Sequence, residues 1–342
     1  MNVQVEWPCK AKFVAGRHPF PRVSTSESRC SPTGLLSTWH EVVPEALLTL
    51  RDMNTISSLM LHDPLLVEEI QSLLGNPHSA GEGYAIYCVD SLTALRKLRA
   101  EVFTLTLTSP PYNIGKEYET PLPLEKYLGW CEQWMREVYR VTRSNGAFWL
   151  NVGYLEKPGR AKALPLPYLL WDRSPFYLVQ EVVWNYGAGV AARKSLSPRN
   201  EKLLWYVKDP EDYTFNLDQI RDPDVKYPLQ KKNGKLRCNT IGKNPSDVWQ
   251  IAKVTSGEAR ASPERTSHPA QFPLDLVNRV VLGFSNPGEL VLDPFMGSGT
   301  VGVSCLQHGR RFLGIEIKSA YCDMAKKRLE AFLTEKRSRL FD

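Results

Sequence analysis

The sequence predicts an α/β fold built on a doubly wound, mainly parallel sheet of seven strands. From residue 84 onward, short runs rich in β-branched and aromatic residues alternate with helical stretches, which is typical of such a domain. In addition, one of the last runs leads into a glycine turn and a helix start. The seven predicted strands are residues 84–89, 102–107, 147–152, 178–184, 203–207, 290–292 and 311–315.

The chain before this pattern has a different composition. Residues 1–35 carry four prolines and several serines, so we expect an arm that is either disordered or packed on the domain. Over residues 41–74 apolar side chains recur at helical spacing on both sides of Pro64, which predicts two helices broken near residues 62–64. We therefore divide the chain into an N-terminal part of unknown role (1–80), two halves of one domain (81–207 and 264–342) and an insert (208–263).

Composition restricts the class of protein. Of the 342 residues, 42% are hydrophobic and 23% charged, as in a globular protein, and no apolar run reaches the ~18–20 residues of a membrane span. The first residues lack the apolar core of a secretory signal. Seven dispersed cysteines without a CxxC pair argue against a disulfide framework and a zinc site, so we expect a cytoplasmic protein without metal. The net charge of +6 permits a polyanionic partner without requiring one.

A glycine-rich loop follows the predicted strand 290–292 and reads Asp-Pro-Phe-Met-Gly-Ser-Gly-Thr over residues 293–300. Its glycines let the backbone approach a ligand, and the N–H groups of the helix start favour polar groups. Glu316 ends the next strand, about 20 residues on, where a carboxylate is well placed to accept two ribose hydroxyls. The loop therefore indicates a nucleoside cofactor, although a plain strand–helix turn would fit the same residues. It lacks the spacing of dinucleotide and P-loop motifs.

A second motif, Ser109-Pro110-Pro111-Tyr112, follows the predicted strand 102–107. The prolines make the turn rigid and leave the carbonyls of Ser109 and Pro110 free to accept hydrogen bonds, as the serine hydroxyl also does. Two acceptors that grip the N–H groups of an exocyclic base amine free its delocalised lone pair, and a tyrosine ring can stack on a base taken out of the helix. The alternative is a proline loop that only ends a strand.

Together the two motifs resemble those of DNA amino-methyltransferases in the permuted arrangement called the beta class. In that class the catalytic tetrapeptide precedes the cofactor loop, and the target-recognition region lies between them, which is the order found in this chain. Residues 268–273 (HPAQFP) also resemble the HPxxxP segment of the family. The resemblance extends from Tyr84 to about the C-terminus and leaves the residues before Gly81 unexplained.

The resemblance implies a permuted class I methyltransferase fold and S-adenosylmethionine as the cofactor. The implied catalytic residues are Ser109, Pro110, Pro111 and Tyr112. The implied cofactor-binding residues are Asp90, His268, Pro269, Phe272, Asp293, Pro294, Phe295, Gly297, Ser298, Gly299, Thr300 and Glu316. Asp90 would lie near the adenine amino group, but a helix N-cap explains it equally well. No role is assigned to Asn113.

The first residue of the tetrapeptide bears on the target base. Family members that act on adenine usually carry aspartate there, and those that act on cytosine usually carry serine, so Ser109 favours N4 of cytosine over N6 of adenine. Methylation at carbon 5 uses a cysteine that follows a proline, and only Cys9, far from the motifs, does so here.

Basic residues predict the surface for double-stranded DNA, although an ordinary solvated surface would account for their charges nearly as well. The predicted DNA-binding residues are Arg193, Lys194, Arg199, Lys231, Lys232, Lys235 and Arg237. We expect base flipping, and a restriction–modification system in which a cognate restriction endonuclease is the functional partner. The alternatives are a methyltransferase for RNA or a protein amide, and a non-catalytic DNA-binding protein on the same fold. The recognised sequence and the oligomeric state stay open.

Overall fold

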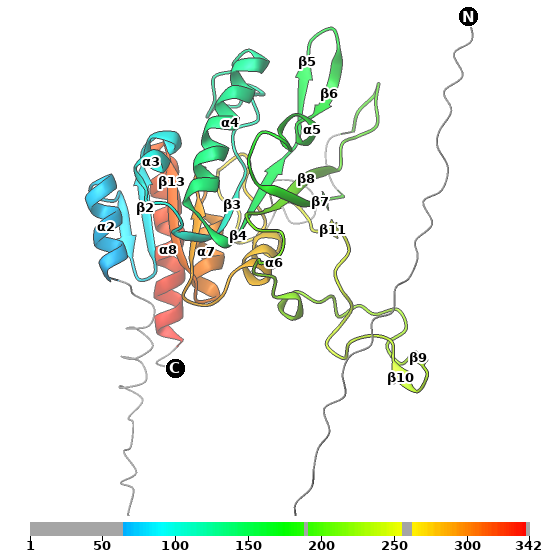
Figure 1. Ribbon diagram of the computed structural model, residues 1–342. Helices are drawn as coiled ribbons and strands as arrows, with labels where there is room; N and C mark the ends of the chain where they lie inside the picture. Colours follow the sequence, from blue (N-terminus) through cyan, green and yellow to red (C-terminus); the bar gives the residue numbers. More distant parts are fainter. Residues whose placement is uncertain (1–63, 188–190, 255–261, 340–342) are drawn as a thin grey trace, which may run out of the picture. The chain divides into compact units, whose positions relative to one another are not determined.

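The computed structural model describes residues 64–187, 191–254 and 262–339. Nine strands of this part form one sheet (Figure 1). In chain order they are β1 (Ser79–Gly81), β2 (Tyr84–Cys88), β3 (Phe103–Thr108), β4 (Thr142–Val152), β7 (Tyr177–Asn185), β8 (Asn200–Val207), β11 (Val248–Gln250), β12 (Leu290–Asp293) and β13 (Arg311–Glu316). Their order across the sheet is β1-β2-β13-β12-β3-β4-β8-β7-β11.

The predicted α/β fold is confirmed, and each of the seven predicted strands is present. The two further strands lie at the edges of the sheet: β1 pairs antiparallel with β2, and β11 pairs parallel with β7. Each has only three residues, too few to show a hydrophobic period. The sequence of the predicted insert 208–263 thus supplies one strand to the sheet.

The topology brings the two halves of the domain together at the centre of the sheet. Strands β2, β13, β12, β3 and β4 run parallel, whereas β8 is antiparallel to both of its neighbours. Strand β12, from the C-terminal half, pairs with β3, from the N-terminal half. Because parallel strands end at the same edge, the loops that follow β3 and β12 meet there, which is where α/β sheets bind ligands.

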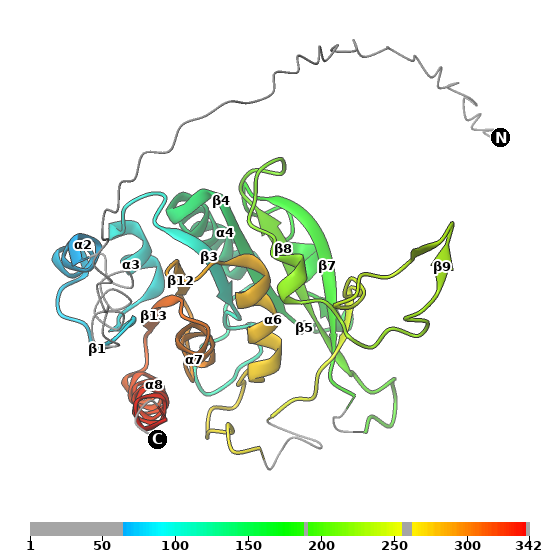
Figure 2. The ribbon, with the colours of Figure 1, turned by 90° about the horizontal axis from the view of Figure 1, so that it is seen from below.

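Helices cover both faces of the sheet, and Figure 2 shows α3 and α4 on one side with α6 and α7 on the other. The helices are α2 (Pro64–Leu74), α3 (Ser91–Lys97), α4 (Leu124–Val141), α5 (Pro167–Leu170), α6 (Leu274–Phe284), α7 (Thr300–Gln307) and α8 (Ser319–Ser338). Strand β4 serves both layers: Phe148 and Leu150 belong to the core under α4, and Trp149 to the core under α6. This alternation explains the uninterrupted apolar run of residues 147–150 in its second half.

Smaller elements complete the described part. Two ribbons, β5–β6 (Tyr154–Lys157 and Ala161–Pro165) and β9–β10 (Lys231–Lys232 and Lys235–Leu236), stand outside the main sheet. A short 3₁₀ helix, η1 (Leu217–Gln219), packs on α6. The second predicted N-terminal helix is found as α2, and the first, like the predicted arm, lies outside the described residues. In the described ranges no helix has the length and apolar character needed to cross a membrane.

Candidate active site

The loops that follow β3 and β12 line one pocket of about 1020 Å³. Most residues predicted to be catalytic or cofactor-binding lie on its wall. They are Asp90, Ser109, Pro110, Pro111, Tyr112, His268, Pro269, Phe272, Asp293, Phe295, Gly297, Ser298, Thr300 and Glu316. The other two shape the loop: the Pro294 carbonyl accepts a hydrogen bond from the Ser91 hydroxyl, and Gly299 caps α7 in the left-handed conformation (φ 74°).

Asp293 joins the two motifs directly. Its Oδ1 accepts hydrogen bonds from the Thr108 hydroxyl (2.7 Å), at the end of β3, and from the Phe295 amide (3.1 Å). The side chain is only 2% exposed, and burial raises its pKa to about 7. A carboxylate is therefore held in the pocket wall at a cost in free energy, and a cationic group of a ligand would reduce that cost.

The glycine loop closes on the end of β13. Gly297 adopts φ 51°, and its amide donates to Glu316 Oε2 at 3.0 Å, while the Lys318 amide donates to Oε1 at 2.9 Å. A Cβ at position 297 would lie 2.8 Å from His268 Nε2, so only glycine fits. Burial is the largest cause that raises the pKa of Glu316. Glu316 lines the pocket, so a lone pair not used by these amides can accept a hydrogen bond from a ligand.

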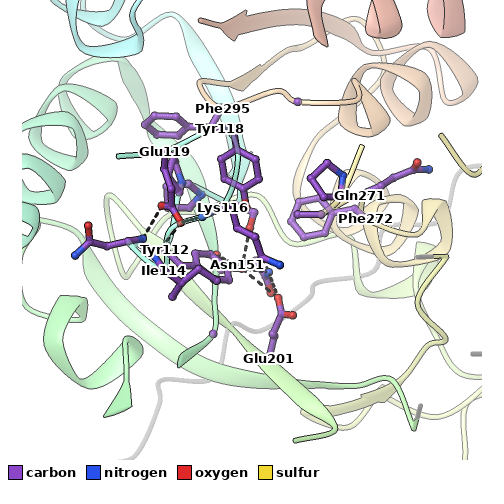
Figure 3. Close-up of a pocket in the computed structure, with 18 of the residues that line it drawn as sticks. Tyr112, Ile114, Lys116, Tyr118, Glu119, Asn151, Glu201, Gln271, Phe272 and Phe295 are labelled. Atoms are coloured by element: carbon purple, nitrogen blue, oxygen red, sulfur yellow. Dashed lines mark hydrogen bonds between the residues drawn. The ribbon is translucent and has the colours of Figure 1, made fainter. Parts of the chain in front are cut away.

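His268 forms part of an aromatic wall. Its Nδ1 accepts a hydrogen bond from the Ala270 amide (3.2 Å), which leaves the ring hydrogen on Nε2. The ring stacks with Tyr118 (centroids 6.0 Å apart) and meets Tyr321 edge-on at 4.5 Å. Burial lowers the pKa of His268 to about 4, so the imidazole is neutral at pH 7. Phe272 lies across the pocket from Tyr112 (Figure 3).

Asp90 serves as the N-cap of α3. Its Oδ2 accepts hydrogen bonds from the amide and the hydroxyl of Thr93, both at 2.8 Å. The same side chain is exposed and lines the pocket, so the capping role and a contact with a cofactor are compatible. The contact with the adenine amino group stays a prediction.

The tetrapeptide is held by side chains from two strands, β4 and β8. The Tyr112 hydroxyl lies 2.8 Å from Ser109 Oγ, 2.7 Å from Asn151 Nδ2 and 3.1 Å from Glu201 Oε2. Burial, followed by the Glu201 charge, raises the pKa of Tyr112 well above its ordinary value, so the phenol stays protonated. Gly153 gives the ring room, because a Cβ there would lie 3.2 Å from it.

The segment after the tetrapeptide is fixed by one carboxylate. Glu119 accepts hydrogen bonds from the amides of Asn113 (2.7 Å), Ile114 (2.8 Å) and Lys116 (3.1 Å), as Figure 3 shows in part. Asn113, to which no role was assigned, adopts φ 63° and exchanges two hydrogen bonds with the backbone of Leu122. It is a turn residue, and asparagine tolerates this left-handed conformation.

Among the pocket residues that the sequence reasoning missed are Asn151 on β4, Glu201 on β8 and Lys253 after β11. A single polar residue inside the apolar run 147–152 is a signal that could have identified Asn151. No comparable signal marks the other two. Their ion pair (2.8 Å) depends on the neighbouring positions of β8, β7 and β11 in the sheet.

The predicted DNA-binding residues fall on two separate elements. Arg199 lines the pocket, and Arg193 and Lys194 are exposed in the same β7–β8 loop. The others, which are also exposed, lie on or beside the β9–β10 ribbon: Lys231, Lys232, Lys235 and Arg237. Figure 1 shows this ribbon at the end of long connections, away from the main sheet. The contacts of both groups with DNA stay a prediction.

The donor set of the pocket fits a nucleoside cofactor that carries a positive charge. The glycine loop leaves a cradle that a Cβ would fill, Asp293 and Glu316 supply two carboxylates, and Phe295 and Tyr118 supply aromatic surface. The Ser109–Tyr112 motif, which follows the neighbouring strand β3, opens into the same cavity. The pocket can thus bring a cofactor and an acceptor group together.

Comparisons with known proteins agree with this reading of the pocket. The family of N6 and N4 methyltransferases described as DNA methylase matches residues 103–327. The Type II methyltransferase M.ScaI of Streptomyces caespitosus is 58% identical over 263 residues, which are 77% of this chain and 86% of that protein. The DNA adenine methyltransferase YhdJ of Escherichia coli (strain K12) is 34% identical over 255 residues, 70% of this chain and 81% of that protein.

Solved structures show the same fold. The structure of the PvuII DNA methyltransferase (cytosine-N4-specific) matches with a TM-score of 0.59 at 20% identity and covers 75% of this chain and 89% of that one. The family match spans more than half of the chain and includes both motifs. The chain therefore belongs to the N6/N4 family of DNA methyltransferases, whose methyl donor is S-adenosylmethionine.

Proposed function

We propose that this DNA methyltransferase modifies the exocyclic N4 of cytosine in duplex DNA. The observation that carries the proposal is Ser109, whose hydroxyl lies in the pocket beside Tyr112, at the position where family members that act on adenine usually carry aspartate. N6 of adenine is the second candidate, because the relative in Escherichia coli, 34% identical, is named an adenine methyltransferase.

The pocket residues divide into two groups in this proposal. Asp293, Glu316 and the glycine loop would hold S-adenosylmethionine, which supplies an electrophilic methyl group on a positively charged sulfur. Asp293 would face the cationic end, since its buried carboxylate gains most from a positive charge. Glu316 would accept the ribose hydroxyls with its remaining lone pairs. The predicted contacts of Asp90, His268, Pro269 and Phe272 complete this group.

The second group would hold the target base. Ser109 Oγ and the carbonyl of Pro110 would accept the N–H groups of the base amine, which localises the nitrogen lone pair. The Tyr112 ring would stack on the base, and its hydroxyl network would fix the plane of the ring. The amine loses a proton once it is methylated, so the reaction needs orientation more than a strong base.

The proposed DNA surface begins at the pocket rim. Arg199 lines the pocket beside Leu196, which is 95% exposed, and Arg193 and Lys194 lie in the same loop. These three charges and those of the β9–β10 ribbon would neutralise phosphates. Several relatives are named Type II methyltransferases, so we also propose a restriction–modification role with a cognate endonuclease as the functional partner.

Long-read single-molecule sequencing tests this proposal. PCR-amplified DNA, which carries no methylated bases, is incubated with the protein and S-adenosylmethionine and then sequenced for the polymerase pauses that modified bases cause. N4-methylcytosine at one repeated sequence is the expected result, and Ser109→Ala should remove it. N6-methyladenine would replace the proposal by its second candidate. No modified base would point to RNA, a protein amide or DNA binding alone.

A further inference from the structure

Three side chains, Ser109, Asn151 and Glu201, lie within hydrogen-bond distance of the Tyr112 hydroxyl. Glu201 Oε1 pairs with Lys253 Nζ at 2.8 Å, and this ammonium lies 3.6 Å from the Tyr186 ring centroid. Glu201 Oε2 lies 3.1 Å from the Tyr112 hydroxyl and 2.8 Å from Asn151 Nδ2. An ion-paired carboxylate has no hydrogen to donate, so Glu201 is an acceptor on both sides.

The carboxylate determines the orientation of the Asn151 amide. Its nitrogen faces Glu201 Oε2 (2.8 Å) and the Tyr112 oxygen (2.7 Å), and the two N–H hydrogens are used by these two contacts. A reversed amide would place its oxygen against the carboxylate, which is repulsive. Asn151 is only 1% exposed, so the orientation cannot relax by contact with water.

The Tyr112 hydroxyl can donate its single hydrogen to either of two oxygens that only accept. These are Glu201 Oε2 at 3.1 Å and the backbone carbonyl oxygen of Asn151 at 3.2 Å. Ser109 Oγ at 2.8 Å is the third neighbour, and it carries a hydrogen of its own. Both hydroxyl hydrogens are used when Tyr112 donates to one of the pure acceptors and Ser109 donates to Tyr112, whereas Asn151 Oδ1 has no hydrogen-bond partner in the described part.

We infer that Glu201 is a positioning residue for methyl transfer: by taking the Tyr112 hydrogen, it orients the Ser109 hydroxyl toward Tyr112 and leaves the serine lone pairs open to the target amine. If Tyr112 donated to Ser109, one of these lone pairs would be occupied. The inference rests on the proposed base pocket, and it applies to an amine on cytosine or on adenine. Glu201 acts through Tyr112 and need not touch the base.

A double-mutant cycle tests this coupling. Glu201→Gln removes the negative acceptor, and Tyr112→Phe keeps the ring but removes the hydroxyl. Single-turnover rates of labelled methyl transfer to long PCR-amplified DNA, at saturating DNA and cofactor, report the chemical step without binding. We expect each single variant to be about tenfold slower, the scale of one hydrogen bond to a charged group, and the double variant to be no slower than the slower single one.

Two controls separate this role from general damage. Glu181→Gln breaks a comparable ion pair, Glu181–Lys202 at 3.5 Å between β7 and β8, and should leave the rate unchanged. Binding of S-adenosylmethionine, measured by calorimetry, shows whether Glu201→Gln is folded. If it is not, Glu201→Asp, which keeps the charge beside Lys253, takes its place in the same cycle, where non-additivity is again expected.

The outcomes are distinct. The inference would be overturned if the double variant were about a hundredfold slower than wild type, which is the product of the two single effects. A Glu201→Gln rate within twofold of the wild-type rate would also overturn it. The rate is measured for whichever base is methylated. A finding of N6-methyladenine would therefore sink the cytosine proposal and still leave the Glu201 cycle decisive.

Discussion

Replacing Asp293 with asparagine should make the protein without cofactor more stable. The pKa of this buried carboxyl rises from its ordinary 3.8 to about 7, chiefly by burial. Because one pKa unit corresponds to about 1.36 kcal/mol, the ionised side chain destabilises the fold by at most about 4 kcal/mol at pH 7 and above. Asparagine keeps an oxygen to accept from Thr108 and Phe295 and carries no charge.

The pH dependence gives this prediction its sign. Between pH 4 and 7 the folded wild type binds more protons at Asp293 than the unfolded chain, so the contribution of this group to stability falls as the pH rises through that window. The asparagine variant has no such dependence. Its advantage in free energy of unfolding should therefore be larger at pH 8 than at pH 5 by about 3 kcal/mol at most.

Urea unfolding of both proteins at the two pH values measures this difference, and Asp172→Asn, an exposed aspartate, serves as the control. Calorimetry should also show that Asp293→Asn binds S-adenosylmethionine more weakly, since the carboxylate is the proposed partner of its positive charge. A stability difference that is equal at pH 5 and pH 8, or a variant less stable than wild type at pH 8, would refute the reasoning.

Three further substitutions test other parts of the site. Gly297→Ala puts a Cβ 2.8 Å from His268 Nε2 at a residue with φ 51°, and it should weaken binding of S-adenosylmethionine by more than about tenfold. The control Gly309→Ala, at φ 70° with open space around the new Cβ, should lower only the free energy of unfolding, by ~1–2 kcal/mol. Equal affinities of the two variants for S-adenosylmethionine, measured by calorimetry, would contradict this prediction. Leu196 is 95% exposed beside the pocket, so Leu196→Ala should slow methylation of a fully paired duplex by about tenfold. Methylation of a duplex that is mismatched at the target base should not slow. Equal slowing with both duplexes would exclude a role of Leu196 in base flipping. Glu119→Gln replaces one of the two accepting oxygens by a donor, so at least one of the three amides loses its acceptor, and kcat/KM should fall by about tenfold. An unchanged value in steady-state assays would show that this turn needs no carboxylate.

The sequence predicts the central strands well and the edges poorly. Strand β12 and the second half of β4 are buried on both faces and stand out as mainly apolar runs. The edge strands β1 and β11 have three residues each, and pairing with a neighbour, which no local pattern shows, determines them. The same distinction applies to the site.

Residues inside the two motifs could be located from sequence because each motif lies on one turn after one strand. Glu201 and Lys253 reach the pocket from β8 and from the chain after β11, so their place depends on strand order. Asp90 shows a different limit: the capping interpretation and the pocket interpretation use the same residue, and the structure accommodates both. The basic residues of the β9–β10 ribbon were grouped by charge alone, and charge does not determine where a ribbon lies.

The central claim is that this pocket methylates the N4 amine of cytosine, and mass spectrometry of nucleosides tests it most directly. Long PCR-amplified DNA is incubated with the protein and S-adenosylmethionine carrying a deuterated methyl group, digested to nucleosides and compared with standards. The account predicts deuterated N4-methylcytosine, and its loss in Ser109→Ala. Deuterated N6-methyladenine in its place would contradict the claim and show that Ser109 does not select the base.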